Sequence, residues 1–146
     1  MTDWKMLTGN ATRQLRRNGF IGGAVALFLV AIAPPTAGAD GFTGPLAWWL
    51  LLALCLLPLA LSVHLLFDAA LFRLAASHDE ENAGLAAMDD VLARMGLRSR
   101  EREPASLTER LAGCRRLVWK QRIALVAGAA LYAVLLLDAA DGACRC

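Results

Sequence analysis

The sequence predicts an all-α membrane protein with three transmembrane helices and a cytoplasmic helical hairpin between the second and the third. Two observations lead to this fold class. Hydrophobic residues make up 58% of the 146 residues, well above the roughly 45–50% that is typical of soluble domains. They also gather in three blocks that charged segments separate. We therefore treat residues 1–146 as a single membrane domain.

The first block predicts a transmembrane span at 19–39, preceded by a basic cytoplasmic N-terminus at 1–18. The span contains no charged residue and is long enough to cross the hydrocarbon core of a bilayer. Pro34 and Pro35 should end the helix, because proline removes helical hydrogen bonds. The block also has features of a secretory signal peptide, including an A-x-A cleavage motif at 37–39. A second span follows almost at once and would anchor the cleaved product anyway, which favours a retained helix.

The second block predicts a span at 46–67, whose helix extends to about residue 76. Nothing in residues 68–76 breaks a helix. The loop before this span is short and rich in turn residues, so the first two spans should form a tight hairpin. Trp48 and Trp49 fall at the outer end of the span, where indole rings favour the membrane interface.

Residues 77–117 predict a cytoplasmic helical segment. Ser77 and Glu80 have the spacing of a capping box, and the helix that they open should end near Gly96. This helix carries one apolar stripe, which more often reflects internal packing than a docking groove for a partner. The stripe consists of Leu85, Met88, Leu92 and Met95.

A second capping box at Ser106 and Glu109 predicts one long helix from about residue 107 to about residue 139. Its apolar positions near the start, Leu107 and Leu111 among them, could face the stripe of the preceding helix. The third span lies at 118–138 if the basic side chains at its inner end reach the headgroups. Residues 139–146 form a tail on the outer side.

The basic residues orient these segments. The third block has a charge-free run at 123–137. All of the fifteen Lys and Arg except Arg145 lie before the first block or between the second block and this run. Three spans put both segments on one side, and the positive-inside rule makes that side cytoplasmic. High Ala, Leu and Arg content suggests a GC-rich bacterial genome. We therefore expect a multi-pass protein of the bacterial inner membrane, with its N-terminus in the cytoplasm and its C-terminus outside.

Small residues at four-residue spacing predict close helix packing, within one subunit or between copies. Gly19 and Gly23 form a G-x-x-x-G motif at the inner end of the first span. Ala124 and Gly128 repeat a small-xxx-small spacing in the third.

His64 and Asp68 are a possible polar site near the inner end of the second span, one helical turn apart. An ionisable side chain in a span is a functional hypothesis by default. In a scaffold protein, Asp68 should instead pair with Arg16, Arg17 or Arg73 at the interface. A bis-histidine haem is not expected, because the only other histidine, His78, lies outside the membrane.

The two C-terminal cysteines, Cys144 and Cys146, are a possible thiol pair on the oxidising side. Such a pair can form a disulfide, link two subunits or hold a soft metal such as Cu(I). No nearby His or Met completes a metal site, and an ordinary chain end is the simplest interpretation. We therefore expect no metal and no cofactor.

The chain carries no phosphate-binding glycine loop, no H-E-x-x-H and no G-x-S-x-G motif. We interpret it as a non-enzymatic accessory, assembly or scaffold subunit of a cytoplasmic-membrane complex. Its expected partners are other membrane-protein subunits, or copies of itself, and anionic lipid headgroups, but not nucleic acid. The alternative is a homo-oligomeric pore or small transporter with His64 and Asp68 at its inner mouth. A membrane enzyme acting on lipid would need these two residues to converge with His78 and Asp79.

Overall fold

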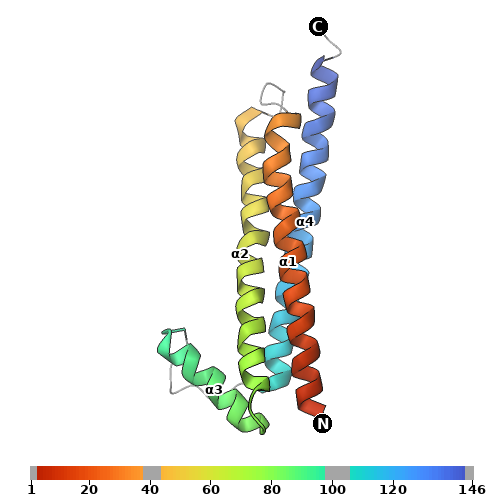
Figure 1. Cartoon of the computed structure of the whole chain (residues 1–146). Coiled ribbons are helices and arrows are strands. Elements are labelled where there is room, and N and C mark those ends of the chain that lie inside the picture. The colour runs from red at the N-terminus through yellow and green to blue at the C-terminus, as the bar shows by residue number, and fades with distance from the viewer. Residues whose placement is uncertain (1–2, 38–43, 98–105, 144–146) are drawn as a thin grey trace. The chain divides into compact units, whose positions relative to one another are not determined.

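A computed structural model shows four helices and describes residues 3–37, 44–97 and 106–143. In chain order the helices are α1 (Asp3–Ala37), α2 (Gly44–Ala76), α3 (Glu81–Arg94) and α4 (Leu107–Ala143) (Figure 1). Helices α1, α2 and α4 are long and apolar enough to cross a membrane, and α3 is a short helix between α2 and α4. The three candidate spans suggest a multi-pass membrane protein.

The chain divides into two compact units. The first unit consists of Met1–Asn18 and His64–Val118, and the second consists of Gly19–Val63 and Trp119–Cys146. Helices α1, α2 and α4 each contribute one segment to the first unit and one to the second, whereas α3 belongs entirely to the first.

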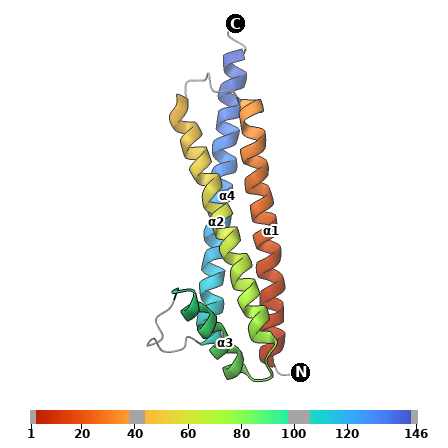
Figure 2. The same ribbon diagram turned by 60° about the vertical axis from the view of Figure 1, so that its left-hand side comes forward.

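The core of the first unit packs α3 against the other three helices. Phe72 and Leu65 of α2, Met88 of α3 and Leu107 of α4 are all buried in one apolar cluster, together with Leu15 of α1. Leu85 and Leu92 of the predicted stripe pack against this cluster, but Met95 is exposed. Figures 1 and 2 both show α3 starting beside the C-terminal end of α2. The stripe therefore serves internal packing over most of its length.

The predicted capping box at Ser77 was wrong. Helix α3 begins three residues later than expected, after Glu80, whose side chain makes no capping hydrogen bond. The Ser77 hydroxyl instead donates to the Leu74 carbonyl at 2.7 Å. A helix leaves its last carbonyls without partners, and Ser77 satisfies one of them at the end of α2.

The C-terminus of α3 follows the sequence prediction. Gly96 adopts a φ of 69°, which glycine reaches without steric cost. Its N–H donates to the Ala93 carbonyl at 3.1 Å, and the Leu97 N–H donates to the Leu92 carbonyl at 3.0 Å. These two bonds form a Schellman motif, which reverses the chain after the helix.

The capping box at the start of α4 is confirmed. The Glu109 N–H donates to the Ser106 hydroxyl at 3.3 Å, and the Ser106 N–H donates to the Glu109 carboxylate at 3.0 Å. These reciprocal bonds satisfy donors that the first turn leaves unpaired. The helix that they open is continuous to Ala143.

The core of the second unit joins α1, α2 and α4 through Leu29, Leu51 and Leu135. The prediction that Pro34 and Pro35 end the first helix was wrong, because α1 continues to Ala37 with both prolines inside it. Its last turn is held by the Thr36 hydroxyl, which donates to the Ile32 carbonyl at 2.6 Å. The Tyr132 hydroxyl of α4 lies 2.7 Å from the Thr36 hydroxyl oxygen.

Candidate functional site

A pair of buried polar side chains joins α2 to α4 in the second unit. Gln121 is 2% exposed and Ser62 is 5% exposed. The Gln121 amide nitrogen donates to the Ser62 hydroxyl oxygen at 2.7 Å, and that hydroxyl donates to the Pro58 carbonyl at 2.7 Å. Buried polar groups are costly unless they are hydrogen-bonded. The Ser62–Gln121 pair therefore favours one register of α4 against α2.

The Ser62–Gln121 pair was not among the residues predicted from the sequence. Gln121 stands between Lys120 and Arg122, so it is easily assigned to the basic flank of the third span. The available signal was its neutrality, because an uncharged amide next to an apolar run can turn inward and bond to a serine of another helix.

Glycines provide the space beside this pair. Gly22 of α1, which the sequence analysis did not single out, is buried against the Gln121 side chain. A Cβ at Gly23 would lie 3.3 Å from the Ser62 hydroxyl, and a Cβ at Gly128 would meet Leu54 of α2 at 3.7 Å. Gly19 and Ala124, the other members of the two small-residue motifs, are both buried.

His64 and Asp68 have different surroundings in the first unit. The His64 side chain is exposed on α2, whereas Asp68 is half-buried. The Cys114 thiol of α4 donates to the Asp68 carboxylate at 3.4 Å. No ion pair within the described part of the chain joins Asp68 to Arg16, Arg17 or Arg73, the partners that the scaffold interpretation expected. Helix α4 thus supplies the contact that we expected from an arginine.

Two ion pairs hold α3 and the loop before it. Asp89 of α3 pairs with Arg110 of α4 at 2.5 Å, and both side chains are largely shielded from solvent. The Lys5 ammonium of α1 lies 2.9 Å from the Asp79 carboxylate. The hydrogen bond and positive charge of Lys5 lower the pKa of Asp79 from its ordinary value of 3.8. Exposed pairs of the Lys5–Asp79 kind contribute little, so the apolar face of α3 remains its main attachment.

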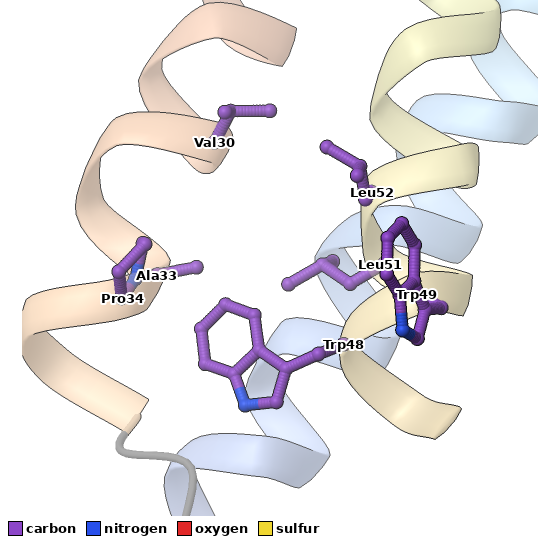
Figure 3. Close-up of a pocket in the computed structure, with 7 residues that line it drawn as sticks. All are labelled: Val30, Ala33, Pro34, Trp48, Trp49, Leu51 and Leu52. Atoms are coloured by element: carbon purple, nitrogen blue, oxygen red, sulfur yellow. The ribbon is translucent and has the colours of Figure 1, made fainter. Parts of the chain in front are cut away.

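An apolar groove lies between α1 and α2 in the second unit (Figure 3). Its volume is about 260 Å³. Figure 3 shows the Trp48 ring extending from α2 toward α1. The lining side chains are apolar apart from the two indole rings. The lining residues are Val30, Ala33, Pro34, Trp48, Trp49, Leu51 and Leu52.

A second cavity, of about 360 Å³, lies in the first unit between α1 and α4. We call it the α1–α4 cleft. Its polar lining groups include the Gln14 amide and the Arg115 guanidinium, and its apolar lining groups include Leu15, Leu111 and Val118. The cleft thus combines a cationic group with an apolar wall.

Within the described residues, no group of three His, Cys, Asp or Glu side chains could hold a metal ion. His64 and His78 do not meet in such a group. The predicted thiol pair, Cys144 and Cys146, lies outside the described residues.

Comparisons with known protein families, with curated protein sequences and with solved structures find no match for this chain. We therefore infer the function from the residues and their geometry.

Proposed function

We propose that this chain is a non-enzymatic accessory or assembly subunit of a complex in the bacterial inner membrane. The observation that carries the proposal is the attachment of α3. One face of this helix is buried through Met88 and Gly84, and Asp89 is paired with Arg110. The opposite face, with Asn82 and Asp90, is exposed. A short helix that is fixed on one side and open on the other is suited to docking a partner protein.

The polar contacts of the long helices support the same function. The Ser62–Gln121 pair and the Cys114–Asp68 contact both join α2 to α4, so these side chains hold the protein's own helices together. The proposed orientation, with the N-terminus in the cytoplasm and the C-terminus outside, follows from the positive-inside distribution of Lys and Arg. It puts α3 on the cytoplasmic side of the membrane.

Site-specific photo-crosslinking in native membranes tests this proposal. A photoreactive residue at Asn82, on the exposed face of α3, should crosslink to one foreign subunit in good yield. The matched control carries the photoreactive residue at position 126 instead. Val126 is 69% exposed on the apolar surface of α4, so a photoreactive residue there should crosslink mainly to lipid. A lack of any protein adduct at Asn82 would contradict docking through α3.

The exposure of His64 favours a second candidate, the homo-oligomeric pore. An imidazole on the outer surface of a candidate span is costly against lipid, and another copy of the chain could cover it. Substitution of His64 and Asp68 by Ala discriminates the two functions. An accessory subunit should keep its partner and its phenotype, whereas a pore should lose conductance or assembly.

A further inference from the structure

The α1–α4 cleft lies at a distinctive depth along its two helices. An α-helix rises about 1.5 Å per residue, so Leu15 lies about 6 Å before the start of the first predicted span at residue 19. Arg115 lies about 4.5 Å before the start of the third at residue 118 by the same rise. The headgroup layer of a bilayer is about 5–7 Å thick on each side. In the proposed orientation the cleft therefore opens at the level of the inner-leaflet headgroups.

The cleft presents cationic and hydrogen-bonding groups that have no partner within the described residues. Neither the Arg115 guanidinium nor the Gln14 amide takes part in a hydrogen bond or ion pair there. No carboxylate lines the cleft. An unpaired guanidinium favours an anion, and its planar donors match the oxygens of a phosphate.

The other side of the cleft is apolar. Leu15 of α1 and Leu111 and Val118 of α4 line it. Leu15 and Val118 lie toward the predicted spans. A ligand that fits both sides must carry a phosphate and a hydrocarbon chain. The volume of about 360 Å³ falls within the range of small-molecule sites.

We propose that the α1–α4 cleft binds one anionic phospholipid of the inner leaflet. Arg115 binds the phosphate, the Gln14 amide donates to an oxygen of the headgroup, and an acyl chain runs along Leu15 and Val118. This proposal rests on the membrane orientation proposed above, but it does not need a partner subunit.

Native mass spectrometry of the purified full-length chain tests this site. The chain is reconstituted in nanodiscs that contain equal amounts of phosphatidylglycerol and phosphatidylethanolamine. The lipids that stay bound to the chain after its release from the nanodisc are counted. The expected result is one retained phosphatidylglycerol. Arg115→Gln should reduce its retention about tenfold, because hydrogen bonds to charged groups are the stronger class. Arg116→Gln is the matched control, since this neighbouring arginine is also exposed but does not line the cleft.

A steric variant separates the cleft from general basic charge. Ala11 lines the cleft, so Ala11→Leu should block the acyl or headgroup position and reduce retention about as much as Arg115→Gln, with every charge kept. The control is Ala112→Leu, at an exposed position outside the cleft. Thermal unfolding of each variant checks that it is folded.

Three outcomes would overturn the proposal. Equal losses in Arg115→Gln and Arg116→Gln would show diffuse electrostatic attraction, to which each basic residue contributes alike. Equal retention of phosphatidylethanolamine would remove the requirement for negative charge. Displacement of the lipid by millimolar inorganic phosphate, without added lipid, would assign the site to free phosphate. Because the assay uses the isolated chain, its failure is distinct from a failure to find a partner subunit.

Discussion

The side chain of Gln121 occupies the space in which Gly22 would carry a Cβ. A Cβ built on Gly22 would lie 2.6 Å from Cδ of Gln121, which is well inside van der Waals contact. The amide that lies there is also the donor to Ser62. In the second unit, α1 therefore approaches the Ser62–Gln121 pair closely because residue 22 has no side chain.

Gly22→Ala should lower the free energy of unfolding by about 1–3 kcal/mol, the usual cost of overpacking. The new methyl group must displace the Gln121 amide and weaken its bond to Ser62. Gly9→Ala is the control in the same helix, because a Cβ there meets no atom within 4 Å. Unfolding of both variants in a mixed-micelle titration measures the difference. Equal stability of the two variants would show that the Gln121 amide can move away from the new methyl group without a loss of free energy.

The Ser62–Gln121 pair should show a measurable coupling energy. A double-mutant cycle with Ser62→Ala and Gln121→Leu should give between about 0.6 kcal/mol, the average for hydrogen bonds between membrane helices, and about 1.7 kcal/mol, the maximum found. The Ser62→Ala variant should be the informative single change, since it leaves a buried amide without its nearer acceptor. Additive effects of the two substitutions would mean that the hydrogen bond does not form in the membrane.

Gly84→Ala should detach α3 from α2. A Cβ at this buried position would lie 2.7 Å from the Ala75 carbonyl oxygen, which belongs to the backbone and cannot rotate away. Hydrogen exchange of the α3 amides should accelerate by at least about tenfold, as local unfolding becomes easier. Gly113→Ala, where a Cβ meets nothing within 4 Å, should leave their exchange unchanged. Unaltered protection in Gly84→Ala would contradict the packing of α3.

The Lys5–Asp79 pair should weaken in acid. Lys5 lowers the pKa of Asp79 below 3.8, so the pair stabilises the folded chain above that pH. This contribution is lost as the pH falls through the lower, folded-state pKa. A carboxyl titration by NMR should show Asp79 titrating below its ordinary range, and Lys5→Gln should raise the pKa again. If the pKa of Asp79 is unchanged in Lys5→Gln, the two residues do not interact.

The sequence was sufficient for the helical class and the three apolar spans, because uncharged runs of this length are typical of membrane helices. The cap at Ser106 and the glycine turn at Gly96 were also predictable, since each depends on residues close together in the chain. The start of α3 was not, because Ser77 has two local options. Its hydroxyl can cap the helix that follows or bond to the helix that precedes it, and the position of α3 on the first-unit core decides between them.

The candidate sites were less predictable than the helices. Gln121, Arg115 and Gln14 matter because of what lies opposite them on other helices, and a single sequence does not contain those pairings. Gly19 and Gly23 were predicted from spacing alone, which cannot show that Gly22, between them, faces the glutamine. The surroundings of Asp68 likewise depend on Cys114, forty-six positions along the chain.

Native mass spectrometry of the untagged chain, extracted gently from its own membrane, is the decisive measurement of the proposed accessory role. We expect a complex in which this chain is joined by a foreign subunit at fixed stoichiometry. We also expect Gly84→Ala to weaken this complex and Gly113→Ala to leave it unchanged. A closed ring that contains only copies of this chain would rule out the accessory role and favour the pore.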